Sequence, residues 1–204
     1  MHLRINDVTV PKSQIDELGE VLSNKALPVV AAEAGYRGLL YAADRNTGNC
    51  AIVSRWETRD ALDASEHAIA SIRMAVLDAV AGTLNRLVLA DVLREVRNVD
   101  SVVGCRSRAV HLAARPNSAD ALLAFYDEEA VPRLQGQPGF LNARLIRDLD
   151  HDGTFIAVSH WKDADALEDS EVISEKLRDK VTDAVPGASI ERVTTSKILL
   201  FASA

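Results

Sequence analysis

Alternating apolar and polar residues mark a short segment near the start of each half of this chain, at residues 3–10 and 108–114. A period of two places successive side chains on opposite faces of an extended segment, which is typical of a half-buried strand. Longer β-rich segments occupy residues 84–96 and 190–201. The pattern therefore predicts a strand at the beginning and at the end of each half.

A helical period follows each of the two opening strands. The apolar positions are Ile15, Leu18, Val21 and Leu22 in the first half, and Leu122, Phe125 and Tyr126 in the second. Ser13 and Ser118 precede these runs, so we expect them to cap the helices. Pro28 and Pro132 are expected to disturb or end the same helices, because proline has no backbone N–H.

Two more strands and a second helix are predicted in each half. The strands are joined by glycine-containing turns at residues 44–48 and 148–153, which favours antiparallel hairpins. Thr58 and Asp163 have the position of helix caps. The apolar positions of the second helices are Ile72, Val76 and Val80 in one half, and Leu177, Val181 and Val185 in the other.

The two halves are copies of one motif. Residues 54–66 return at 159–171 with an offset of 105, whereas upstream matches such as Gly35 and Gly139 have an offset of 104. One inserted residue in a turn accounts for the difference, so the chain carries a duplicated domain. Each copy has the order β-α-β-β-α-β, which is the ferredoxin-like unit.

This organisation predicts an α+β protein with two tandem ferredoxin-like domains at 1–97 and 108–204, joined by a linker at 98–107. A four-stranded sheet with both helices on one face leaves its other face uncovered, and an apolar face of that size is a liability. We therefore expect the two copies to pack sheet to sheet, as an intrachain pseudo-dimeric α/β barrel.

Composition narrows the function classes. The net charge of −7 disfavours nucleic-acid binding. No apolar stretch is long enough for a membrane span, and residues 1–6 do not resemble a signal peptide, so we expect a cytoplasmic protein without a membrane partner. Cys50 and Cys105 are interpreted as free thiols, with a disulfide as the alternative. No motif has metal-ligand spacing, so no metal is expected.

A strand-ending tryptophan followed by a capped Asp-Ala-Leu helix occurs at 56–62 and at 161–167, with Ala34-Gly35-Tyr36 and Pro138-Gly139-Phe140 upstream. This pattern resembles the antibiotic biosynthesis monooxygenase family of dimeric α/β barrels. That family includes quinone-forming oxygenases, haem-degrading enzymes and members with no established reaction. The resemblance implies a small-molecule ligand, and it leaves further homodimerisation open.

The quinone-forming branch associates its pocket with the strand-ending Trp, an Asn four residues before it and a Tyr six residues after it. Trp56 and Trp161 match the first of these residues. The other positions are apolar in both copies: Ile52 and Leu62 in the first, Ala157 and Leu167 in the second. The resemblance therefore does not carry over the polar partners of the Trp.

The haem-degrading branch uses an Asn on the first strand, a Trp in the second helix and an axial His. Asn6 matches the Asn, but Ser65 or Ser170 stands at the Trp position. Met74 or Asp179 stands at the axial position. His67 lies two turns earlier, roughly 10 Å along the helix at 1.5 Å per residue. Haem is therefore disfavoured, and no cofactor is expected.

The resulting site hypothesis places ligand-binding groups at Asn6, Trp56, Ser65, His67 and Trp161, with Asn6, Trp56 and Trp161 as candidate catalytic residues. We predict a cofactor-independent monooxygenase for a small aromatic or polycyclic substrate. The alternative is a non-catalytic binding or assembly module with the same fold. For the tryptophans, the alternative is that they only fill the core at the strand ends.

Two further expectations concern the difference between the copies. Asn6 aligns with Val110, so the second pocket is expected to be drier and the first half to be the functional one. Arg55 and His160 precede the tryptophans and, by strand alternation, are expected to point to the opposite face of the sheet.

Overall fold

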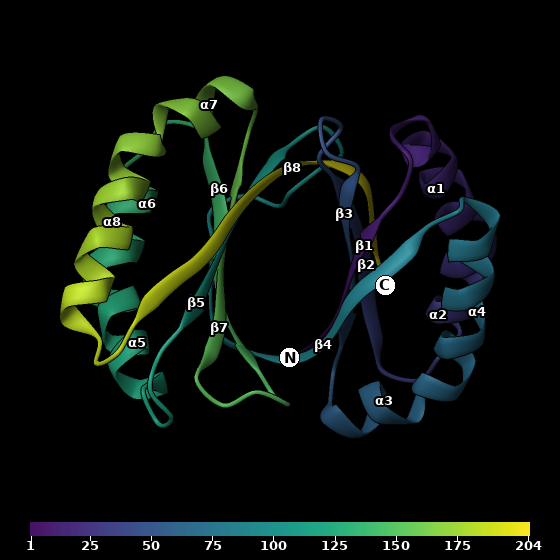
Figure 1. Cartoon of the computed structure of the whole chain (residues 1–204), viewed down its shortest axis with the longest axis horizontal. Helices are drawn as coiled ribbons and strands as arrows, with labels where there is room; N and C mark the ends of the chain where they lie inside the picture. Colours follow the sequence, from purple (N-terminus) through teal and green to yellow (C-terminus); the bar gives the residue numbers. More distant parts are fainter. The chain divides into compact units, whose positions relative to one another are not determined.

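The computed structural model describes all residues 1–204, and each copy folds in the predicted order of elements (Figure 1). The first copy comprises β1 (His2–Thr9), α1 (Ile15–Val21), α2 (Leu27–Ala31), β2 (Tyr36–Ala43), β3 (Asn49–Trp56), α3 (Arg59–Ala64), α4 (Glu66–Ala79) and β4 (Thr83–Arg97). The second comprises β5 (Arg106–Ala113), α5 (Ala119–Phe125), α6 (Val131–Gln135), β6 (Phe140–Asp148), β7 (Thr154–Trp161), α7 (Ala164–Asp169), α8 (Glu171–Ala184) and β8 (Ser189–Ser203).

All observed strand pairs of the two hairpins are antiparallel. β3 lies between β1 and β2, and β7 lies between β5 and β6. The hydrogen-bonded order of the eight strands is β1-β3-β2-β8-β5-β7-β6-β4, and this order closes on itself. The predicted α+β class and the tandem ferredoxin-like, barrel-forming topology are confirmed.

Two compact units divide the chain, and each contains part of both sequence copies. One unit comprises residues 1–90 and 196–204, and the other comprises residues 91–195. β4 and β8, each 15 residues long, therefore begin in one unit and end in the other. Within the first unit the end of β8 pairs with β2. The units thus differ from the sequence copies, because the end of β4 belongs to the second unit and the end of β8 to the first. The predicted domains at 1–97 and 108–204 follow the copies and place each of these strands in one domain.

In each unit the helices cover one face of the sheet, and the core lies between them (Figure 1). In the first unit, Ile15 and Leu18 of α1 and Val76 of α4 belong to the same buried cluster as Tyr41 and Trp56 of the sheet. The second unit repeats this arrangement. Its cluster includes Leu122, Leu177, Val181, Leu145 and Trp161. The helical periodicity of the sequence thus identifies the faces that are buried.

Two of the four predicted helix caps are confirmed. Thr58 Oγ1 accepts a hydrogen bond from Ala61 N at 3.1 Å, and Asp163 Oδ1 accepts one from Ala166 N at 2.9 Å. The cap at Ser13 is wrong, because a short 3-10 turn at Lys12–Gln14 precedes α1. Ser118 stands at the start of α5 but donates its hydroxyl to Pro186 O instead of capping.

Each first helix contains one π-helical turn, at Leu22–Ala26 and at Tyr126–Ala130. These turns directly precede the segments that carry Pro28 and Pro132 near their first residues. The prolines therefore disturb the helix without ending it: the helical conformation continues to Ala31 and Gln135, and a π-turn precedes each proline. π-Turns are rare and occur often at functional sites.

The segment predicted as a linker is bound to the sheet of the second unit. Asn98 N and Val99 N donate to Leu141 O at 2.9 and 3.1 Å. The buried Ser101 Oγ shares a hydrogen bond of 2.6 Å with His160 Nδ1 and accepts one of 2.8 Å from Asn142 Nδ2. His160 is thereby enclosed, and burial, assisted by the positive charge of Arg144, lowers its pKa to about 3.

Replacing Gly139 by Ala should destabilise the protein more than replacing Gly104 by Ala. Both glycines have positive φ, of 76° and 100°, so both variants carry similar backbone strain. A Cβ at Gly139 would lie 2.5 Å from Ala166 Cβ, whereas a Cβ at Gly104 would have no heavy atom within 4 Å. We expect an additional cost of about 1–3 kcal/mol at Gly139, measured by urea unfolding. Equal costs at both positions would contradict the packing argument.

The free energy of unfolding should decrease as the pH is lowered, in a window set by the pKa values of His160. The pKa of His160 is lowered in the folded state to about 3, against about 6.5 when unfolded. The unfolded chain therefore binds a proton first, and the contribution present above pH 6.5 is lost as the pH falls toward 3. The slope is at most about 1.4 kcal/mol per pH unit.

Urea unfolding of His160→Asn and wild type between pH 5 and 7 measures this contribution. The His160→Asn variant should show a flatter profile there, and the matched variant His67→Asn, at an exposed helix position, should keep the wild-type profile. Identical profiles for wild type and His160→Asn would refute the assignment.

Candidate active site

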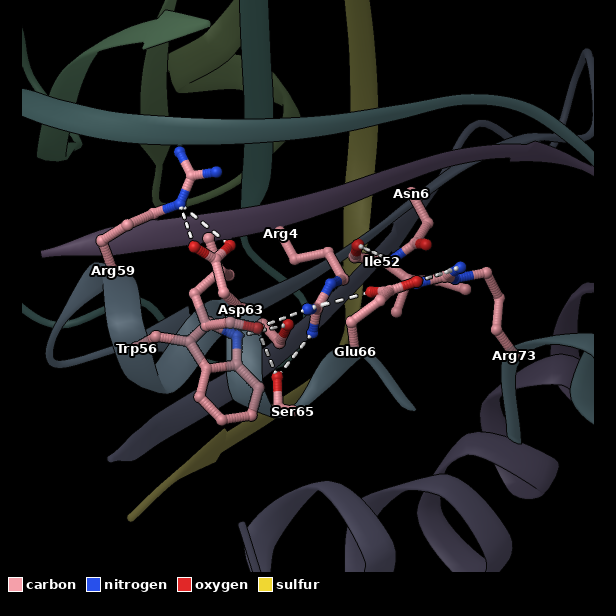
Figure 2. A network of polar contacts seen from close by, with 11 residues as sticks. Arg4, Asn6, Ile52, Trp56, Arg59, Asp63, Ser65, Glu66 and Arg73 are labelled. Carbon is pink, nitrogen blue, oxygen red and sulfur yellow. Dashed lines mark hydrogen bonds and ion pairs between the residues drawn. The ribbon is translucent and has the colours of Figure 1, made fainter. Parts of the chain in front are cut away.

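A buried arginine on β1 organises the polar part of the first unit. Arg4 is 1% exposed and donates hydrogen bonds to Ser65 Oγ at 3.0 Å and to Leu62 O at 2.6 Å. It also forms an ion pair of 3.0 Å with Glu66 (Figure 2). A buried charge is tolerated only with such partners. The break between α3 and α4 at Ser65 supplies them.

The second unit contains the same arrangement around Arg108. This residue is 3% exposed and donates to Ser170 Oγ at 2.8 Å, Ser174 Oγ at 2.6 Å and Leu167 O at 2.8 Å. Its ion-pair partner is Glu171, at 2.5 Å.

Trp56 and Trp161 pack against these arginines. The guanidinium carbon of Arg4 lies 5.6 Å from the centroid of the Trp56 ring, and that of Arg108 lies 6.0 Å from Trp161. Both distances suit cation–π attraction. Each indole N–H donates to a nearby serine at 2.9 Å, Ser54 in one case and Ser159 in the other. Both tryptophans are fully buried.

A second arginine joins each carboxylate. Arg73 binds Glu66 at 3.1 Å (Figure 2), and Arg178 binds Glu171 at 2.5 Å. Two arginines and one glutamate leave a net charge of +1 in each cluster. Burial lowers the pKa of Arg108, and the charge of Arg178 lowers it further, although Glu171 opposes both effects. An additional negative charge near these groups would therefore be stabilised.

Beside each cluster lies a cavity between the sheet and the helices. The cavity of the first unit has a volume of about 40 Å³. Its polar lining consists of Asn6, Ser54 and Arg73, and the remaining lining is apolar, including Leu22 and Ala26 of the π-turn. Asn6 Nδ2 donates to Ile52 O at 3.3 Å, which leaves Asn6 Oδ1 buried and without a partner.

The cavity of the second unit is larger, with a volume of about 80 Å³. Smaller side chains create the space, because Ala157 replaces Ile52 and Ser174 replaces Ile69. Its polar lining residues are Arg108, Tyr126, Ser159, Ser174 and Arg178. Polar side chains line both cavities, so the expectation of a drier second pocket stays a prediction.

The structure separates the predicted site residues into three groups. Asn6 lines a cavity, whereas Trp56 and Trp161 line neither. Each tryptophan binds a lining serine, and Trp161 also packs against Arg108 of the second lining. Ser65 accepts a hydrogen bond from Arg4. His67 is exposed on α4. The packing interpretation of the tryptophans agrees with their position in the core.

The sequence interpretation missed the arginine clusters. They carried a signal that could have been used, because all members except Ser174 are identical in the two copies. The matched pairs are Arg4 and Arg108, Ser65 and Ser170, Glu66 and Glu171, and Arg73 and Arg178. Identity of four polar residues across two otherwise divergent copies indicates a shared structural demand.

A family model described as antibiotic biosynthesis monooxygenase matches residues 1–71 and 106–171. The chain belongs to this family. The matched segments contain both buried arginines and both tryptophans, and each segment ends close to the Ser-Glu pair that opens the long second helix.

The chain is similar to known proteins in sequence and, separately, in structure. Two uncharacterized proteins of Mycobacterium tuberculosis are 25% and 28% identical over 154 residues, which cover 74% and 76% of this chain and 67% and 65% of theirs. A "putative monooxygenase" of Fusobacterium nucleatum superimposes with a TM-score of 0.71 at 16% identity, covering 99% of this chain and 94% of that one. An anthrone oxidase-like protein gives 0.67 at 16% identity, covering 99% and 93%.

Other site classes find no support among the described residues. No group of three or more histidine, cysteine, aspartate or glutamate side chains is arranged to hold a metal ion. None of the helices has both the length and the apolar composition that a transmembrane span requires. Cys50 and Cys105 are both buried free thiols, as predicted.

Replacing Glu171 by Gln should destabilise the second unit, because the buried Arg108 would lose its counter-charge. Glu171 is 48% exposed, so we expect a reduced cost of roughly 1–3 kcal/mol. The matched variant Glu57→Gln, which breaks the exposed pair with Arg37, should cost less than about 1 kcal/mol. Urea unfolding measures both variants.

A double-mutant cycle identifies the cause. In an Arg108→Met background the buried charge is gone, so Glu171→Gln should cost clearly less and lose only its pair with Arg178. A full, additive loss in that background would contradict the role assigned to the pair.

Proposed function

We propose that this chain is a cofactor-independent monooxygenase that acts on a small aromatic or polycyclic substrate. The observation that carries the proposal is an apolar cavity edged by a buried arginine cluster of net charge +1, in a chain of the monooxygenase family. The anthrone oxidase-like neighbour is consistent with such a substrate. An electron-rich substrate anion can itself reduce dioxygen, and a nearby fixed positive charge stabilises that anion.

The reaction balances without a resident redox group. An activated CH₂ carbon loses a proton, and the resulting carbanion transfers electrons to dioxygen. One oxygen atom forms a carbonyl at that carbon. The other leaves as water with the two hydrogens removed from the carbon.

The cavities contain no strong proton acceptor. Neither is lined by a histidine, aspartate, glutamate or cysteine. The substrate must therefore be acidic enough to ionise with electrostatic assistance alone. Electrostatic stabilisation of this kind is often the largest single contribution to catalysis.

The residues do not fit a haem. The positions where haem-degrading relatives would need a Trp hold Ser65 and Ser170, which bind the buried arginines instead. The axial positions hold Met74 and Asp179, and both are exposed. These occupants support the proposal of cofactor independence.

The second candidate is a non-catalytic small-molecule-binding module. The absence of a histidine or a carboxylate from both cavity linings favours it, since burial raises the pKa of Tyr126 in the second cavity and keeps its hydroxyl protonated. The two candidates differ in turnover, and both involve a bound ligand.

Oxygen consumption with anthrone and dithranol, which both carry an activated CH₂ carbon, tests the catalytic proposal after correction for autoxidation. We expect enzyme-dependent uptake, and a loss of at least about tenfold in kcat/KM for Arg178→Gln. The variants Asn6→Ala and Trp56→Phe test the residues that the family resemblance suggested. Binding of these compounds without any uptake would leave the binding module as the function.

A further inference from the structure

The two cavities differ in the polar atoms that they leave without partners. In the first, the acceptor Asn6 Oδ1 and the donor Arg73 Nε are both buried and unpaired, so that cavity offers one group of each kind. In the second, the position of Asn6 is held by Val110, and the unpaired buried atoms are Arg178 Nη1, Arg108 Nε and the hydroxyl of Tyr126. Guanidinium groups only donate hydrogen bonds. A ligand of the second cavity must therefore supply acceptors.

Tyr126 is specific to the second cavity. It is 4% exposed, it opens the π-turn Tyr126–Ala130, and Leu22 occupies its position in the first copy. Burial raises the pKa of Tyr126, so its hydroxyl keeps the proton and can donate it in a hydrogen bond. Buried polar groups without partners are rare in proteins and call for an explanation.

Charge and space agree with this polarity. Arg108 and Arg178 share one carboxylate, Glu171, so the cluster has an uncompensated positive charge. The rest of the lining is apolar, with Leu122, Phe125 and Leu177 among its members. The cavity has twice the volume of its counterpart.

We propose that the cavity of the second unit binds a molecule with an apolar aromatic body and one anionic oxygen group, which Arg178 and Tyr126 hold, and that the first cavity does not bind it. This inference rests on the proposed role of the cavities in ligand binding and assigns that role to one of them. It reverses the expectation that the first half is the functional one.

Calorimetric titration of the whole chain with 2-naphthoate and with its neutral analogue 2-naphthamide tests the assignment. Wild type should bind 2-naphthoate at least tenfold more tightly than the amide, because hydrogen bonds to a charged acceptor are the stronger kind. Arg178→Gln should remove this preference, and Arg178→Lys should keep part of it. Tyr126→Phe should weaken 2-naphthoate binding severalfold.

The first unit provides the matched control. Arg73→Gln changes the equivalent arginine and should leave both affinities unchanged. Thermal unfolding followed by circular dichroism verifies that each variant is folded. In Trp56→Phe, the only remaining tryptophan is Trp161, whose fluorescence should respond to 2-naphthoate because its serine partner lines the second cavity.

Three results would overturn the assignment: equal affinity for the acid and the amide, an equal loss in Arg73→Gln and Arg178→Gln, or no binding of 2-naphthoate at millimolar concentration. Failure of the catalytic proposal looks different. Selective binding of 2-naphthoate without oxygen consumption by any substrate would support this inference and contradict catalysis.

Discussion

One buried arginine on the first strand of each copy determines how the surrounding elements are built. Arg4 and Arg108 are charged groups beneath a sheet, so their hydrogen-bond donors must be satisfied within the protein. The second helix breaks at a serine to present a carbonyl and a hydroxyl, and the next residue is the glutamate that balances the charge. The tryptophan packs on the guanidinium and fixes a serine of the cavity wall. Removing the arginine would deprive all of these features of their common partner.

Much of the fold was predictable because its elements follow from local sequence patterns and because these patterns occur in both copies. Period-two and period-3.6 patterns identified the strands and helices, and Thr58 and Asp163 were recognisable as caps. The failures have physical causes. A 3-10 turn replaces the cap expected at Ser13. The exchange of the ends of β4 and β8 depends on which sheet edge a long strand extends, and no local pattern records that choice.

The candidate site was less accessible to sequence reasoning. Asn6 was identified through the family resemblance and does line a cavity. Arg4 was overlooked because a polar residue in an alternating strand is ordinarily read as facing solvent, and burial of the polar face is a tertiary property. His160 shows the same limit: its enclosure depends on Ser101, which is 59 residues away in the chain. Only agreement between the copies could have singled out the arginine clusters.

The exchanged strand ends make this chain the covalent equivalent of a heterodimer. Each unit contains residues from both copies. A mutation that lengthens or shortens β4 or β8 therefore affects both units. All cavity-lining residues except Ile190 lie outside β4 and β8, so their substitution changes one unit alone. In an assembly of identical subunits every substitution occurs in all sites together. A fused gene escapes this symmetry, so its two cavities are free to diverge, as the exchange of Ile52 for Ala157 illustrates.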